Sequence, residues 1–481
     1  MKRKETCWNF KLYVVFCLLT FIFTMQFSIA QTGPNKLSVV VGTPFQQLPS
    51  TGPKKISIIA APEETIPAVF GVKYSGNLSN VRVSVASDLK GPGTIERLNC
   101  EISKIIDDEL VNQVSSSSGA VFTSVDITDQ PTIIWLTVSV PKRTPPGLYK
   151  GFVGFYYQNK LYDSVPIELN VRPMRLLGSS KQYLLYSSFT PTSDAIGEDG
   201  LDYNYAGFLG AFKTIGFSNA SVNAPTTEIG CAFRSYAHTG LRSPILIAKY
   251  AFDPQIPTFD EIVLIENARK AAGIESALYF CVDNPNTDEQ IETAINQLNI
   301  LKQLRIKTGA RVSSSESLAK IQYLLNAISY SIDMDYIRSL LDGTGNRESS
   351  AWQYYWWDAR NSVDDNRRYA GLALWKSGLD GCMPVWMPKE GQNSMIDGVR
   401  SLKTEAIRAG IDDTRYITSY MRVLREVKDL KRDIDNQLIE ESEAYLKKYL
   451  SGDMTKLTHS QMNEFRERMA DYVIKFEARL K

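Results

Sequence analysis

The chain has 481 residues, of which 43% are hydrophobic and 22% are charged, enough apolar side chains to fill more than one core. Its formal net charge is +1, so it lacks the basic excess that marks a nucleic-acid-binding protein. These figures favour two or three globular domains and a neutral partner, and they give no support to nucleic acid as a partner.

Residues 1–30 have the features of a signal peptide. A basic segment, residues 2–4, precedes an uncharged apolar stretch, 12–27, and Ser28-Ile29-Ala30 then offers small residues to a signal peptidase. The apolar stretch is shorter than the roughly 20 residues of a spanning helix; an uncleaved N-terminal anchor is the alternative. Without this segment the net charge is −2 and no later run has spanning length. We therefore expect an exported protein (periplasmic, cell-surface or extracellular) without an integral membrane segment after cleavage.

Residues 31–176 contain short runs rich in Val, Ile, Thr and aromatic residues, separated by turn sequences such as Gly-Pro-Gly and Pro-Pro-Gly. Regular short strands with this punctuation are typical of an antiparallel β-sandwich. The expected strands are 55–59, 66–72, 81–85, 133–140, 151–157 and 164–171.

In residues 177–428 the pattern changes to a strand followed by a helical stretch, repeated. Two of the helical stretches begin with capping boxes, Thr258 to Glu261 and Thr287 to Gln290. Eight strands that alternate with helices predict an α/β fold, a (β/α)8 TIM barrel. The expected strands are 183–188, 217–222, 244–250, 277–283, 309–313, 327–332, 352–357 and 382–386.

Residues 429–481 carry two apolar stripes at helical spacing, which predict a C-terminal helical extension in the form of a hairpin packed on the barrel. A coiled coil that binds a partner is the alternative.

Cysteine and histidine are too sparse for a metal or disulfide framework. After residue 30 the four cysteines are far apart with no CxxC pair, and only His238 and His459 are available. Thr458-His459-Ser460-Gln461 is a helix-start sequence, so we expect His459 to be an exposed first-turn residue. We expect no metal and no cofactor, and any catalysis should be carried by carboxylates.

Barrel enzymes place reactive groups where strands end. The fourth strand ends at Asp283-Asn284-Pro285, which is also good sequence for a plain strand-to-helix turn. Sugar rings stack on aromatic side chains, so aromatic residues at strand ends predict a carbohydrate site. The candidate substrate-binding residues are Tyr250, Tyr355, Trp356, Trp357 and Trp386.

Three ordered segments, Trp135–Tyr149, Arg367–Gly381 and Glu405–Tyr416, resemble sequences of glycoside hydrolase family 123 and its relatives, the domain of unknown function 4091. The resemblance covers about residues 130–425 by motif order. It implies substrate-assisted cleavage of β-linked N-acetylhexosaminides, in which the acetamido oxygen of the sugar attacks the anomeric carbon. An Asp orients and stabilises the acetamido group, and the adjacent Glu protonates the leaving oxygen.

In the family this pair is Asp-Glu, whereas the present sequence has Asp283-Asn284 as the candidate catalytic residues. An amide cannot deliver a proton, and loss of a general acid costs about 10²- to 10⁴-fold. Either another carboxylate replaces it (the candidates are Asp333, Asp335, Asp358 and Glu228) or hydrolysis is lost. The hypotheses are therefore an exported glycoside-hydrolase-like protein that acts on N-acetylhexosamine-containing glycans, and a non-catalytic glycan-binding or envelope structural protein on the same fold.

Overall fold

A computed structural model describes residues 37–114, 121–187, 189–191, 196–241, 245–247, 258–331, 351–386, 400–430 and 436–480. The predicted signal peptide therefore lies outside the described residues. Among those residues, no helix is both long enough and apolar enough to cross a membrane.

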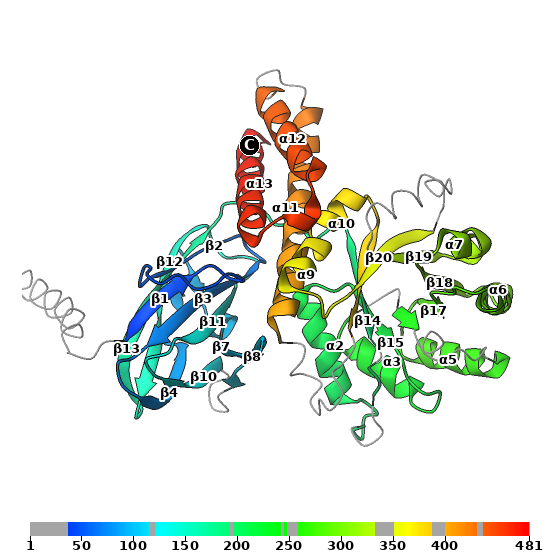
Figure 1. Ribbon diagram of the computed structural model, residues 1–481, viewed down its shortest axis with the longest axis horizontal. Coiled ribbons are helices and arrows are strands. Elements are labelled where there is room, and N and C mark those ends of the chain that lie inside the picture. Colours follow the sequence, from blue (N-terminus) through cyan, green and yellow to red (C-terminus); the bar gives the residue numbers. More distant parts are fainter. Residues whose placement is uncertain are drawn as a thin grey trace, which may run out of the picture.

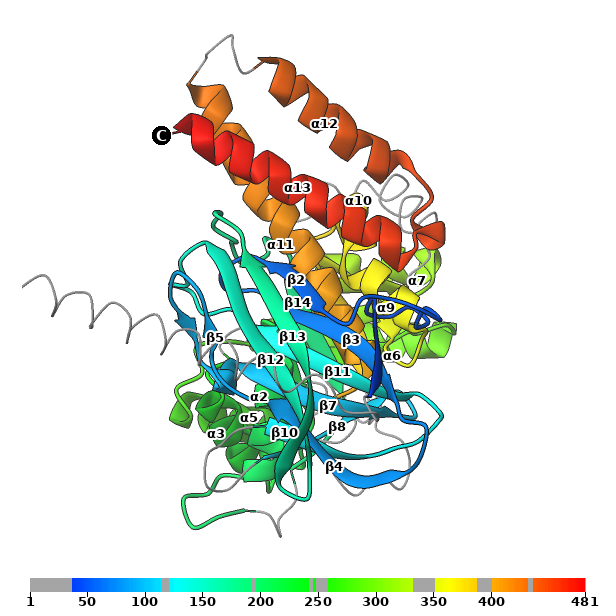
Figure 2. The same cartoon turned by 90° about the vertical axis from the view of Figure 1, so that its left-hand side faces the viewer.

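The N-terminal part consists of two sheets around one core (Figures 1 and 2). Alternate residues of the strands are buried, as in Ile56–Ala60, so each sheet turns one face inward. Between the sheets, the rings of Phe70 and Phe155 meet edge to face at 6.4 Å. One sheet has the order β1 (Ser38–Gly42), β3 (Thr65–Lys73), β11 (Thr132–Ser139), β7 (Cys100–Ile106), β8 (Glu109–Val111). The other has the order β2 (Ile56–Ala60), β13 (Lys160–Val171), β12 (Gly147–Tyr157), β4 (Leu78–Val85), β10 (Val121–Ile127), β9 (Gln113–Val114), with β5 (Leu89–Lys90) and β6 (Thr94–Ile95) beside β12.

The second part is a ring of eight parallel strands that pair in chain order and close where the last strand pairs with the first. They are β14 (Gln182–Ser187), β15 (Asn219–Val222), β16 (Ile245–Ile247), β17 (Ala277–Asp283), β18 (Lys307–Val312), β19 (Ala327–Ser331), β20 (Trp352–Asp358) and β21 (Gly381–Trp386). The predicted mixed α/β fold is confirmed.

Helices lie outside the ring (Figure 1). Both predicted capping boxes are present: Thr258 and Glu261 start one helix, and Thr287 and Gln290 start another. The helices around the ring are α2 (Tyr203–Ile215), α3 (Ile229–His238), α5 (Phe259–Ala271), α6 (Asp288–Gln303), α7 (Ser315–Ile321), α9 (Val363–Ala370) and α10 (Leu372–Ser377).

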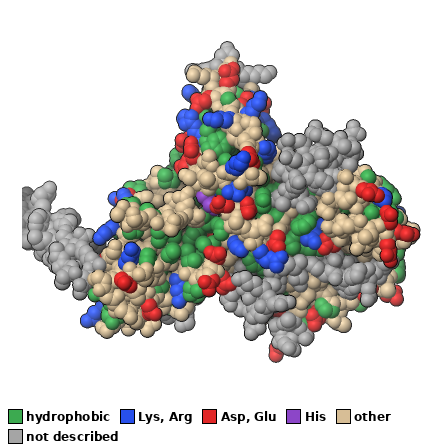
Figure 3. All heavy atoms as spheres, in the orientation of Figure 1, with side chains coloured by type: hydrophobic (Ala, Val, Ile, Leu, Met, Phe, Trp, Pro, Cys, Tyr) green, Lys and Arg blue, Asp and Glu red, His purple; other side chains and the backbone are tan. Residues whose placement is uncertain are grey.

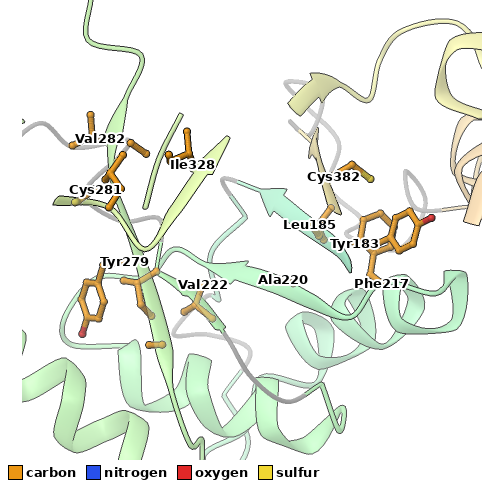
Figure 4. Packing of buried hydrophobic residues seen from close by; sticks show 14 of the residues in the cluster. Tyr183, Leu185, Phe217, Ala220, Val222, Tyr279, Cys281, Val282, Ile328 and Cys382 are labelled. Atoms are coloured by element: carbon orange, nitrogen blue, oxygen red, sulfur yellow. The ribbon is translucent and has the colours of Figure 1, made fainter. Parts of the chain in front are cut away.

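Alternation along the ring strands separates two cores. The larger cluster lies between strands and helices and includes Leu185, Val222 and Tyr279 (Figure 4). The smaller one fills the interior of the ring and includes Tyr186 and Phe280. Because successive side chains of a strand point to opposite faces, this division shows which residues face the axis of the ring.

Three C-terminal helices, α11 (Leu402–Asp429), α12 (Asn436–Ser451) and α13 (His459–Leu480), share a further core. Helix α11 lies between the two parts of the molecule and contacts both (Figures 1 and 2). On the sheet side, the hydroxyl of Tyr416 donates to Glu64 at 2.7 Å. On the ring side, Gly410 approaches Gly371 so closely that an added Cβ would lie 2.5 Å from the carbonyl oxygen of Arg367, so only glycine fits there.

A buried ionic cluster ties these helices together. Asp413 of α11 accepts from Arg367 of α9 at 3.0 Å and from the Nε of Arg466 of α13 at 2.8 Å, and Arg466 also approaches Glu64 at 3.4 Å. Burial raises the pKa of Glu64. On the face of the molecule drawn in Figure 3, basic and acidic side chains are interspersed, as expected for a nearly neutral chain.

The expectation that His459 is exposed is wrong. Thr458 and Gln461 do cap the start of α13 as predicted, but the His459 side chain is only 3% exposed. Its ring stacks on Phe45 at 4.7 Å and its Nδ1 lies 3.3 Å from Arg367. A first-turn position does not exclude burial when another segment of the chain covers it.

Candidate functional site

The candidate site lies at the mouth of the ring, where the strands have their C-terminal ends. Asp283 is the last residue of β17, the fourth strand of the ring, as predicted. A register shift between Phe280 and Val282 makes both Cys281 and Val282 face the helices. This bulge re-aims the next residue, and Asp283 consequently turns toward the axis of the ring, where its partner lies.

That partner is Arg311, which pairs with Asp283 in the register of β17 and β18. Its Nε and one terminal nitrogen each donate to one carboxylate oxygen of Asp283, both at 2.6 Å. The Arg311 and Asp283 side chains are 12% and 24% exposed. A bidentate pair of this kind fixes the carboxylate geometrically and cancels its charge.

Two aromatic rings hold the guanidinium of Arg311. It lies 5.0 Å from the ring centre of Tyr186, on β14, and 4.6 Å from that of Trp356, on β20. Cation–π contacts of this kind are strongest when they are shielded from water. The floor of the mouth is therefore a packed group of Tyr186, Arg311, Trp356 and Asp283, contributed by four strands.

Asn284 begins the turn after β17. Its φ of 52° lies in the left-handed region, which asparagine tolerates better than most residues. Its backbone N–H donates to the carbonyl of Arg311 at 2.8 Å, and the hydroxyl of Ser313 donates to its side-chain oxygen. The strand-to-helix turn that the sequence allowed is thus present, and it places an amide rather than a carboxyl group beside Asp283.

Of the predicted aromatic contacts, Trp356 faces the interior of the ring. It packs on the interior cluster and is partly exposed. Within the described part of the chain, its indole N–H has no hydrogen-bond acceptor. Trp356 is therefore the aromatic residue that the structure brings to the Asp283–Arg311 pair.

The expectation that Tyr355 and Trp357 line the mouth is wrong. Tyr355 is fully buried on the helix side, where its hydroxyl donates to the carbonyl of Tyr369. Trp357 is 1% exposed and its indole N–H donates to Asn366 of α9 at 2.8 Å. The physical reason is alternation: in a run of four aromatic residues, every second one must face outward.

Trp386, at the end of β21, belongs to the same outward set. It is partly buried and packs on Phe212 of α2, with ring centres 5.8 Å apart. Among the described residues, its contacts lie on the helix side and not with the interior group. Its predicted role in binding remains a prediction. Tyr250 lies outside the described residues.

Two of the four carboxylates that could replace the missing acid lie within the described residues. Asp358, at the end of β20, forms a bidentate pair with Arg360, which lowers the pKa of its carboxyl. A lowered pKa keeps this group ionised and makes it a poor proton donor. Glu228 is a partly exposed residue before α3. Asp333 and Asp335 lie outside the described residues.

Sequence reasoning missed Arg311, Tyr186 and Ser313. The signal for Arg311 was present, because a charged residue in the middle of the buried strand Gly309-Ala310-Arg311-Val312 requires a partner. Its counterion, however, lies 28 residues earlier in the chain. Among the described residues, no group of His, Cys, Asp or Glu side chains is arranged to hold a metal ion.

The ring of strands and the preceding pair of sheets form an arrangement that is also found in a glycoside hydrolase of known structure. The chain is similar in structure to a family 123 glycoside hydrolase from Clostridium perfringens, described for glycolipid glycan hydrolysis, with a TM-score of 0.62 and 11% identity over 92% of this chain and 99% of that one. The resemblance seen in the sequence motifs is thus confirmed at the level of the fold.

A family 39 glycoside hydrolase from Bacteroides cellulosilyticus WH2 is more distant, with a TM-score of 0.35 and 9% identity over 74% of this chain and 81% of that one. No protein-family model and no curated protein matches the sequence.

Proposed function

We propose that this chain is an exported protein that binds N-acetylhexosamine-containing glycans at the mouth of the ring and hydrolyses them poorly or not at all. In this proposal, residues 31–176 are a β-sandwich, 177–428 a (β/α)8 barrel of the family 123 type, and 429–481 a helical hairpin. The observation that carries it is the bidentate Asp283–Arg311 pair beside Asn284.

Arg311 reduces the negative charge that Asp283 could offer to a transition state. Substrate-assisted cleavage builds positive charge on the acetamido group as its oxygen attacks, and an ionised carboxylate stabilises that charge. Arg311 already neutralises the carboxylate of Asp283, with both oxygens engaged at 2.6 Å. The pair would therefore give the transition state much less stabilisation than a free carboxylate.

Cleavage also requires a proton for the leaving group. Asn284 occupies the position of the acid in the family's Asp-Glu pair and has no proton to deliver. Asp358 is held ionised by Arg360 and is a poor substitute. Two independent features therefore weaken the same reaction, whereas neither prevents a sugar from binding.

Asp283 and Trp356 can still recognise a sugar at the mouth of the ring. The Asp283 carboxylate has lone pairs outside its contacts with Arg311, and these can accept from a hydroxyl or an amide N–H of a sugar. Trp356 supplies an aromatic surface in the same group. A few fixed polar groups next to an aromatic side chain are what a neutral glycan requires.

Binding of an N-acetylhexosamine oligosaccharide, measured by calorimetry, tests this proposal. We expect saturable binding that Trp356→Ala weakens by about tenfold, on the scale of the loss of one aromatic contact. Trp352→Ala is the matched control because Trp352 lies at the opposite end of the same strand and is 37% exposed. Equal affinities in both variants, or no binding by the parent protein, would contradict the proposal.

Export is proposed separately, from residues 1–30. Fractionation of cells that express the full chain should recover the protein outside the cytoplasm and shortened by about thirty residues. Recovery of an unshortened chain in the cytoplasm would contradict it.

A further inference from the structure

The Asp283–Arg311 pair should influence which glycans bind at the mouth of the ring. The pair is mostly buried and carries no net charge, and Arg311 is held in place by Tyr186 and Trp356. A ligand that reaches Asp283 therefore also meets a fixed guanidinium whose position cannot adjust freely.

A free carboxylate in this position would favour a different ligand. Removal of the acetyl group from an N-acetylhexosamine leaves an amine, which is protonated in mildly acidic solution. An ionised, partly buried carboxylate attracts an ammonium group strongly, since charges interact more strongly where water is excluded. Asp283 alone would thus select the de-N-acetylated sugar.

We infer that Arg311 is a specificity-determining residue that makes the mouth select N-acetylated over de-N-acetylated hexosamine glycans. Arg311 removes the attraction by satisfying the carboxylate, and it adds repulsion between two cations. The neutral acetamido group avoids the repulsion and can still donate its N–H to a free lone pair of Asp283. Specificity of this kind depends on a repulsive element as much as on an attractive one. The inference rests on the proposed function and extends it to the state of the sugar nitrogen.

The experiment compares affinities for two probes of equal length, a chitin oligosaccharide and its fully de-N-acetylated counterpart, in mildly acidic buffer at low salt. The parent protein should prefer the acetylated probe. Arg311→Gln should shift the ratio of the two affinities toward the amine by about tenfold or more. Arg311→Lys, which keeps the charge but loses the two-pronged geometry, should retain the preference of the parent.

Because Arg311→Gln leaves a buried carboxylate unpaired, a second variant covers the case in which it does not fold. Asp283→Asn leaves Arg311 between its two aromatic rings without a counterion, and should bind the amine probe even less than the parent does. Added salt should reduce the shifts in both variants, since they are electrostatic.

The outcomes separate the two proposals. An unchanged affinity ratio in folded Arg311→Gln, or stronger amine binding by Asp283→Asn, would overturn the role of Arg311. Failure of the parent to bind the acetylated probe would overturn the proposed function. In that case, a gain of amine binding in Arg311→Gln still supports the exclusion of an amine by Arg311, and the absence of a gain overturns that exclusion as well.

Discussion

Arg367 and Asp413 form a fully buried ion pair, 3.0 Å from nitrogen to oxygen, that joins helix α9 to helix α11. Each belongs to one of the sequence segments that resemble family 123, and Trp135 of the third segment packs near Leu402 at the start of α11. The segments that carry the resemblance therefore meet at the joint between the two parts of the molecule, where Gly410 also lies against Gly371. These segments therefore belong to the contact between the two parts, whereas the proposed chemistry depends on Asp283 and Asn284.

This joint should dominate the stability of the C-terminal helices. Asp413→Ala removes the carboxylate that both Arg367 and Arg466 contact. We expect a loss of about 3–5 kcal/mol in the free energy of unfolding, because two buried guanidinium groups lose the carboxylate that they contact. Denaturant titration measures the change, and Glu443→Ala, which breaks the exposed pair with Lys428, should cost at most about 1 kcal/mol. A similar loss in both variants would argue against a special role for the buried cluster.

The buried histidine should make stability depend on pH. Burial, together with the charge of Arg367, lowers the pKa of His459 to about 4, despite the carboxylate of Asp364 at 2.6 Å from its Nε2. In the unfolded chain the ordinary pKa is about 6.5. The unfolded state therefore binds a proton that the folded state refuses, and stability falls as the pH falls from about 6.5 toward 4.

Chemical denaturation between these pH values tests the role of His459. As the pH falls over this range, the free energy of unfolding of the parent should decrease by up to about 3 kcal/mol more than that of His459→Gln. Because Glu64 and other carboxyls titrate in both proteins, only the difference between them is informative. His238→Gln is the matched control, because His238 is an exposed residue at the end of α3. This variant should behave as the parent does. Parallel pH profiles for the parent and His459→Gln would show that the ring titrates normally.

Local patterns predicted the elements well. The expected strand 277–283 has those bounds, and the strand expected at 352–357 extends only one residue further. Alternation, turn residues and capping boxes are local signals, so they can be read from short windows of sequence.

The directions of side chains could not be predicted in the same way. Tyr354-Tyr355-Trp356-Trp357 is aromatic on both faces of its strand, so the pattern contains no phase that separates inward from outward residues. The ion pair of Arg311 and the burial of His459 both depend on segments far away in the chain. These are properties of the assembled fold, which no local window contains.

The opposite directions of Trp356 and Trp357 should separate binding from stability. Trp357→Ala should reduce the free energy of unfolding by about 3–5 kcal/mol, because it empties a buried site and leaves Asn366 without its donor. In the molecules that remain folded, glycan affinity should be close to that of the parent. Trp356→Ala should weaken glycan binding and should reduce the free energy of unfolding less than Trp357→Ala does. If Trp357→Ala weakens binding more than Trp356→Ala at equal folded fraction, the assignment of the two faces is incorrect.

The last prediction concerns the missing acid. The parent should barely cleave an alkyl β-N-acetylhexosaminide, whose leaving group needs a proton, and should do better on an aryl glycoside, which needs little help. Asn284→Glu should raise turnover of the alkyl substrate selectively. The gain should remain below the 10²- to 10⁴-fold typical of a positioned acid, because Arg311 still neutralises Asp283.

Asn284→Gln is the matched control, since it has the length of glutamate without the proton, and it should leave both rates unchanged. Both variants place a longer side chain at a φ of 52°, which should cost about 1 kcal/mol of stability, so rates must be compared at equal folded fraction. Asp283→Ala should abolish whatever turnover the parent has, because it removes the group that orients the acetamido oxygen. Rapid cleavage of the alkyl substrate by the parent, unaffected by Asp283→Ala, would mean that the reaction uses other residues and that the mouth of the ring has been assigned the wrong chemistry.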